Sequence, residues 1–182
     1  MRKNILVYGF IGGLIPAAWA VVVEAMLSNS LSLNTRMVLG YTSMIIAFSL
    51  IFVAVKNYRD NYNNGIITFG NTLKIGLLIT LIASTIYVIV WMVDYSYFIP
   101  DFGEKYQAQV LAELKASGAS AAVIKKQGAE MAVMMEKYKS SPAFRVMFTY
   151  LEIVPVGIVV SLIAALILKN KSKPATVVST MN

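Results

Sequence analysis

The sequence contains no cysteine and no histidine. Their absence excludes disulfide bonds, thiolate nucleophiles, zinc sites with nitrogen or sulfur ligands, and catalytic machinery of the Ser-His or Cys-His kind. Charged residues are also scarce, at 14% of the 182 residues, where a soluble domain has about 25%. Glycine-rich phosphate loops and side chains at metal-ligand spacing are missing as well. We therefore expect no enzymatic activity, no catalytic residue, no metal site and no cofactor.

Apolar residues, in contrast, make up 58% of the chain. A domain of this size buries only about two-thirds of its unfolded surface, so part of this apolar surface has to face lipid. Four apolar runs are each long enough to cross a bilayer as a helix: residues 5–27, 37–55, 73–95 and 144–168. Strict two-residue alternation, which barrel strands need, is absent. The sequence predicts an all-α fold, a four-helix transmembrane bundle formed as one membrane domain over residues 1–182.

The first run has one alternative interpretation, a cleaved signal peptide. Arg2 and Lys3 would precede its apolar part, and Ala18-Trp19-Ala20 would supply the small residues of a cleavage site. The apolar run continues past this site to Leu27, however, and is long enough to span a bilayer. We therefore expect a retained transmembrane helix.

Residues 100–142, between the third and fourth runs, form a polar insertion. Apolar side chains recur in it at helical spacing, in two pieces that are interrupted at Ser117-Gly118. This predicts a helical hairpin that lies over the bundle or on the lipid headgroups. The alternative is a partly disordered loop, because Gly, Ser, Ala and Lys dominate the segment. Residues 169–182 are predicted to be a basic, disordered tail.

The basic residues indicate the orientation, because short loops rich in Lys and Arg stay in the cytoplasm. Four spans place both ends of the chain on one side, together with half of its 16 basic residues and a single acid, Asp60. Most basic residues of the other half lie within 100–142, a long loop in which the rule has less force. We expect cytoplasmic termini and an extracytoplasmic insertion. The net charge is +7, and the basic residues lie beside the apolar runs. This position favours lipid headgroups over nucleic acid as the partner.

Ionisable residues at membrane depth are candidate functional residues, because each costs about 2.5–3.5 kcal/mol to insert. The candidates all fall in the outer half of the predicted bundle: Glu24, Arg36, Asp94, Arg145 and Glu152. One hypothesis is an interhelical cluster of ion pairs and hydrogen bonds that locks the bundle. The other is that Glu152, together with Glu24, binds a proton or cation or lines a substrate cavity.

Prolines within two of the runs are predicted to break the helices. Pro16 lies in the first run, and Pro155 in the fourth would free the carbonyl of Leu151 beside Glu152. Paired broken helices are typical of transporter sites.

Two further patterns concern packing. Small residues recur at four-residue spacing and predict close helix contacts within the chain, with a homo-oligomer as the alternative: Gly9 and Gly13; Gly76, Thr80 and Ser84; Gly157, Ser161 and Ala165. Aromatic residues at the end of the third run predict a girdle at the outer membrane surface: Trp91, Tyr95, Tyr97 and Phe98.

Several short motifs occur in a recognisable order along nearly the whole chain: residues 40–44 (GYTSM), 56–60 (KNYRD), 65–70 (GIITFG) and 152–157 (EIVPVG). In this order they resemble the bacterial four-span inner-membrane family of unknown function DUF4199. The resemblance implies a small protein of the bacterial inner membrane. It implies no activity and supplies no site residues.

These patterns favour a non-enzymatic membrane protein with an accessory, structural or interaction role. Its partners would be the lipid bilayer and either another membrane protein or a second copy of the chain. The alternative is a small oligomeric transporter or ion-coupled protein that uses Glu152.

Overall fold

The computed structural model describes residues 1–23 and 30–170. These residues form six α-helices: α1 Arg2–Val22, α2 Leu33–Tyr62, α3 Phe69–Tyr97, α4 Phe102–Ala116, α5 Ala121–Ser140 and α6 Pro142–Leu168. No strand occurs in the described ranges, so the predicted all-α fold is confirmed. Glu24 and most of the predicted tail, residues 171–182, lie outside the described residues.

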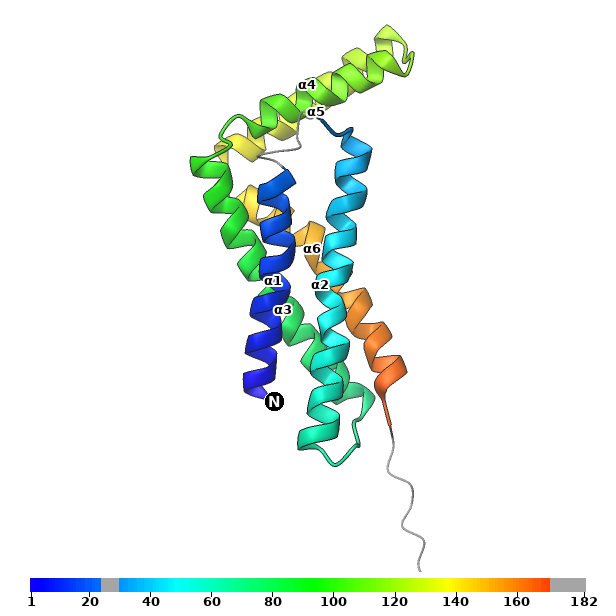
Figure 1. Cartoon of the computed structure of the whole chain (residues 1–182). Helices are drawn as coiled ribbons and strands as arrows, with labels where there is room; N and C mark the ends of the chain where they lie inside the picture. The colour runs from blue at the N-terminus through cyan, green and yellow to red at the C-terminus, as the bar shows by residue number, and fades with distance from the viewer. Residues whose placement is uncertain (24–29, 171–182) are drawn as a thin grey trace, which may run out of the picture.

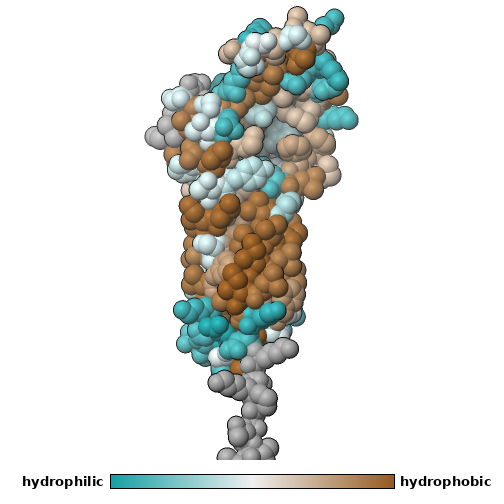
Figure 2. Space-filling model, turned by 90° about the vertical axis from the view of Figure 1, so that its right-hand side faces the viewer, coloured by the Kyte–Doolittle hydropathy of each residue, from teal (hydrophilic) through white to brown (hydrophobic). Residues whose placement is uncertain are grey.

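Four of the helices, α1, α2, α3 and α6, are long and apolar enough to cross a membrane. They run side by side, and α3 packs against both α1 and α6 (Figure 1). Apolar side chains cover the middle of the molecule, and hydrophilic side chains gather towards its two ends (Figure 2). This is the architecture of a multi-pass membrane protein.

Two of the helices extend beyond the apolar runs that predicted them. The run at residues 37–55 lies within α2, which spans Leu33–Tyr62, and the run at 73–95 lies within α3, which spans Phe69–Tyr97. Each begins at a capping residue, because the side chains of Ser32 and Thr68 accept a hydrogen bond from a backbone N–H of the first turn. The apolar run marks only the part of a helix in contact with hydrocarbon, whereas the helix itself continues into polar sequence.

Helices α4 and α5 form a hairpin that lies across one end of the bundle, which we call the hairpin end (Figure 1). The chain reverses at Gly118, whose φ of 77° lies in the left-handed region that glycine adopts without strain. Ser120 then caps α5 by accepting a hydrogen bond from the N–H of Val123. The insertion between the third and fourth spans is therefore helical, as the sequence predicted.

Neither proline breaks its helix, so that prediction is wrong. Pro16 lies inside α1 and Pro155 inside α6, and both helices continue past them. A proline removes one backbone hydrogen bond, and neighbouring helices in a membrane protein compensate for it. Pro16 is fully buried in such packing.

The small residues pack within the chain, as their spacing predicted. Gly13 lies against the backbone of Ala83, so α1 and α3 approach closely. Gly76 faces Ser161, and Gly157 faces Thr80, across the contact between α3 and α6. Glycine permits this approach because it has no Cβ. These stripes are thus occupied by contacts within the chain.

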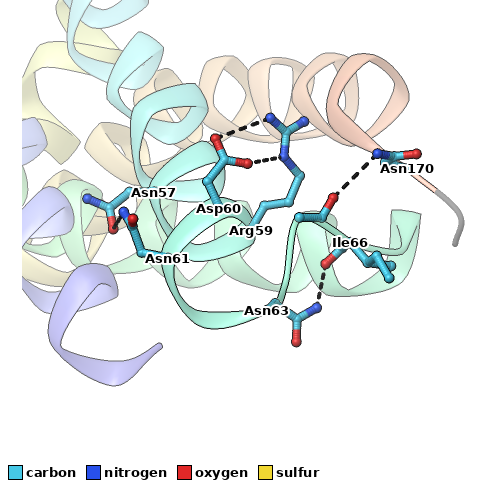
Figure 3. Close-up of polar contacts among 8 residues, drawn as sticks. Asn57, Arg59, Asp60, Asn61, Asn63, Ile66 and Asn170 are labelled. Atoms are coloured by element: carbon cyan, nitrogen blue, oxygen red, sulfur yellow. Dashed lines mark hydrogen bonds and ion pairs between the residues drawn. The ribbon is translucent and has the colours of Figure 1, made fainter.

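Polar contacts hold together the end of the bundle opposite the hairpin (Figure 3). Ile67, in the loop between α2 and α3, exchanges two backbone hydrogen bonds with Asn170, just after α6, at 3.3 and 2.8 Å. Asn4 of α1 donates to Asn57 of α2 at 3.2 Å. Among the described residues, Arg59 forms an ion pair with its neighbour Asp60, at 2.7 Å, and such surface pairs contribute about 0–1 kcal/mol. The motifs at residues 56–60, near the end of α2, and 65–70, in the loop before α3 and its first residues, therefore contribute structural contacts.

Candidate functional site

A cavity of about 470 Å³ lies at the hairpin end, between α2, α3 and α6 on the bundle side and α4 and α5 on the hairpin side. We call it the hairpin cavity. Its volume falls in the range of about 300–1000 Å³ that is usual for small-molecule sites. Because five helices contribute to its wall, the cavity exists only when the hairpin is docked on the bundle.

Aromatic side chains dominate the wall of the hairpin cavity. They come from every contributing helix: Tyr41, Tyr87, Trp91, Phe102, Tyr106, Tyr138 and Phe148. Met37, Met134 and Met135 add flexible, polarisable side chains that adapt to irregular ligands. Among the residues that the structure describes, Arg36 and Glu152 are the charged ones in the lining. The cavity is thus suited to a largely apolar molecule with one polar part.

The exposure of the lining residues shows where the cavity opens. Met37 on α2 and Leu151 on α6 are 54% and 64% exposed, whereas Tyr87 and Tyr138 are 7% and 6% exposed. The first pair belongs to the mouth and the second to the deep wall. Met37 and Leu151 lie on helices that are long and apolar enough to span a membrane, so the mouth lies between α2 and α6.

Glu152 lies where two cavities meet. It lines the hairpin cavity and also a smaller one of about 130 Å³ that reaches Pro16 and Trp19 of α1. Within the described ranges, no hydrogen bond or ion pair involves the Glu152 carboxylate. A carboxylate in such apolar surroundings is costly without a partner.

Arg36 connects the start of α2 to the hairpin. Its guanidinium donates to Oε1 of Gln109 on α4 at 3.0 Å, and Nε2 of Gln109 donates to the carbonyl of Leu31 at 3.1 Å. Glu113, one turn further along α4, accepts a hydrogen bond from the N–H of Leu33 at 2.9 Å. These bonds hold α4 over the cavity.

Tyr138 fixes α5 to the bundle. Its hydroxyl accepts a hydrogen bond from Nε1 of Trp91 at 2.6 Å, and its ring meets those of Tyr95 and Phe148 edge-on at 5.6 and 6.0 Å. Burial raises the pKa of the Tyr138 phenol above its ordinary value, so the hydroxyl stays protonated at neutral pH. The hairpin is therefore docked through aromatic contacts as well as through Arg36.

Replacing Tyr138 by phenylalanine is expected to loosen the hairpin. The change removes the acceptor of the partly buried Trp91 N–H, and leaving a buried donor unsatisfied costs about 1–3 kcal/mol. Hydrogen exchange should show faster exchange of the α5 amides in this variant. Tyr106→Phe is the matched control, since no hydrogen bond involves that hydroxyl in the described structure. Equal exchange in both variants would contradict the role given to Tyr138.

The four predicted polar residues that the structure describes do not form one cluster, and Glu24 lies outside the described residues. Arg36 and Glu152 share the hairpin cavity, whereas the buried Asp94 does not line it and its Oδ2 has no hydrogen-bond partner. Arg145 is also buried, with its guanidinium carbon 3.9 Å from the centre of the Tyr95 ring. Among the described residues, no ion pair joins these side chains to each other. Aromatic rings, and not carboxylates, surround Arg145.

The aromatic wall is the part of the site that the sequence analysis missed. Tyr97 and Phe98 are exposed, as a membrane girdle requires, but Tyr95 is buried and Trp91 turns inward to line the cavity. The signal was present in the sequence. Tyr87, Trp91 and Tyr95 recur every four residues, which places them on one face of a helix.

Comparison with known proteins identifies a family. The model of the family described as protein of unknown function, DUF4199, matches residues 7–170. This range includes the hairpin, every described residue of the cavity, and the bundle apart from the start of α1. No curated protein and no solved structure matches the chain.

Proposed function

The chain belongs to the DUF4199 family of unknown function, the family that its motifs resemble, and from its hairpin cavity we propose that it binds an amphipathic small molecule. In this proposal it is a non-enzymatic, multi-pass protein of the bacterial inner membrane with an interaction role. The observation that carries the proposal is an aromatic cavity that holds charged side chains and has its mouth between two helices long and apolar enough to span a membrane. A ligand dissolved in the bilayer could enter between α2 and α6 without crossing water.

The proposal places both ends of the chain in the cytoplasm and the hairpin outside. The distribution of basic residues supports this orientation, since Arg2, Lys3, Lys56 and Arg59 lie next to spans at the end opposite the hairpin. Hydrophilic side chains also gather at that end in Figure 2. The hairpin cavity would then lie at the level of the outer leaflet.

An uncharged fluorescent probe tests for binding in the cavity. We expect N-phenyl-1-naphthylamine to bind the purified full chain in nanodiscs, with enhanced emission. Met134→Trp should fill the cavity and weaken binding about tenfold or more, which corresponds to about 1.4 kcal/mol. Val133→Trp is the matched control, because Val133 lies next to Met134 in the sequence but is 61% exposed and does not line the cavity. Equal binding to both variants would refute a ligand site in the cavity.

A membrane-protein partner or a second copy of the chain also stays within the proposal. The small-residue stripes do not support a second copy, because they pack inside the chain. The exposed hairpin is the surface that a partner would reach. Cysteines introduced into it should crosslink to a partner in native membranes if the protein is an accessory subunit.

Ion-coupled transport is the second candidate. It is favoured by the position of Glu152 at the junction of two cavities, one of which extends to α1. Proton-linked flux in vesicles tests it. Glu152→Gln would abolish the flux of a transporter while its fold persists, whereas Asp94→Asn, outside both cavities, would leave the flux intact.

A further inference from the structure

We propose that the ligand of the hairpin cavity is an organic cation with apolar or aromatic substituents, and that the Glu152 carboxylate pairs with its charge. This inference rests on the proposed function, since it names the class of molecule that the cavity takes. It has three supports: a carboxylate with no partner among the described residues, the aromatic wall with its opening between α2 and α6, and the way in which the same end of the molecule holds Arg145.

The first support is the charge of Glu152. Its side chain lines the cavity, and no donor among the described residues reaches it. A buried carboxylate is stabilised by a cation that comes within contact distance. A metal ion is a poor match, because Ca²⁺ takes six to eight oxygen ligands and Mg²⁺ six, whereas Glu152 is the one carboxylate among the described residues of the lining.

The second support is the aromatic wall. The faces of Trp and Tyr rings attract cations and form the cages that bind quaternary ammonium groups. Tyr41, Tyr87 and Trp91 line the cavity together with Glu152. A cation surrounded by carbon substituents needs few hydrogen-bond acceptors, which suits a wall that offers few. The opening between α2 and α6 would admit such a cation from the bilayer.

The third support comes from Arg145, which shows how this end of the protein holds a buried cation. Its guanidinium carbon lies 3.9 Å from the centre of the Tyr95 ring and 5.8 Å from that of Tyr138. Within the described structure it has no carboxylate partner. Tyr138 also belongs to the cavity wall. The Tyr138 ring, which lies near the Arg145 guanidinium, therefore also borders the space in which the ligand cation would bind.

Arg36 is the residue that argues for the opposite charge. It lines the same cavity, and its guanidinium already donates to Gln109 on α4. If Arg36 set the sign of the site, the cavity would prefer anions. A pair of ions with the same shape and opposite charge separates the two cases.

Tetraphenylphosphonium and tetraphenylborate form such a pair. Binding of each to the full chain would be measured by titration calorimetry in phosphatidylcholine nanodiscs, with the signal of empty nanodiscs subtracted. We expect tetraphenylphosphonium to bind about tenfold more tightly or better than tetraphenylborate, as one favourable charge contact requires. Equal or reversed preference in the unmodified protein would overturn the proposal, and this comparison needs no variant to fold.

Variants assign the charge to Glu152. Glu152→Gln should weaken tetraphenylphosphonium binding about tenfold and leave binding of the uncharged naphthylamine probe within about twofold. Asp94→Asn, a buried carboxylate outside the cavity, should change neither. Unchanged tetraphenylphosphonium affinity in Glu152→Gln would overturn the inference, while binding of the uncharged probe would still support the proposed function. Failure of both probes to bind would refute the proposed function itself.

Discussion

Replacing Gly13 by leucine is expected to separate α1 from α3 and to lower the free energy of unfolding by about 3 kcal/mol or more, because overpacking a tight contact forces the backbone to move. A Cβ at position 13 would lie 2.6 Å from the carbonyl oxygen of Ala83 and 3.0 Å from its Cα. These are backbone atoms of a buried helix, which cannot rotate away as a side chain can. Thermal unfolding in detergent, followed by circular dichroism, should show a markedly lower midpoint.

Gly40→Leu is the matched control for this experiment. It introduces the same side chain into another membrane helix, but a Cβ at position 40 would meet no atom within 4 Å. We therefore expect its unfolding midpoint to stay near that of the unmodified protein. If both variants unfolded at the same temperature, the close contact between α1 and α3 would not exist as described.

Replacing Arg145 by glutamate is expected to undock the hairpin and to destabilise the bundle. The guanidinium lies over the Tyr95 ring at 3.9 Å and is 5% exposed. A desolvated cation–π contact contributes about 2 kcal/mol or more. Glutamate would lose this contact and place a negative charge against the negative faces of the rings. We expect faster hydrogen exchange throughout α5 and a lower unfolding midpoint.

Two controls separate charge from bulk. Arg145→Lys keeps a cation near the ring and should lose much less stability than Arg145→Glu. Arg2→Glu makes the same charge reversal at an exposed position, where substitutions usually change stability by about 0.5 kcal/mol or less. Equal loss in Arg145→Lys and Arg145→Glu would show that packing, and not the cation–π contact, holds this residue.

The bundle was predictable from the sequence because hydrocarbon thickness fixes the length of an apolar span. The runs at residues 37–55 and 73–95 located α2 and α3, but not their ends. Those ends depend on capping by Ser32 and Thr68 and on polar turns that hydropathy does not register. The two prolines were misjudged for a related reason. Whether a proline breaks a helix depends on the other helices that pack against it, and the local sequence does not show which helices these are.

The candidate site was predictable only in part. Charge at membrane depth singled out Glu152 and Arg36, both of which line the cavity. Their surroundings could not be foreseen, because the rotation of each helix decides which side chains meet. Arg145 illustrates this, since its partner is the Tyr95 ring and Tyr138 of the docked hairpin lies nearby. That docking depends on contacts between helices far apart in the sequence.

The most direct test of the membrane architecture is labelling of single cysteines, for which a chain without native cysteine is a ready background. Ser117→Cys lies at the tip of the hairpin and Asn61→Cys near the end of α2, on the two sides of the α3 span. In intact spheroplasts, a membrane-impermeant maleimide should label Ser117→Cys at once and Asn61→Cys only after permeabilisation. Labelling of both from outside, or of Asn61→Cys alone, would contradict four crossings with an external hairpin.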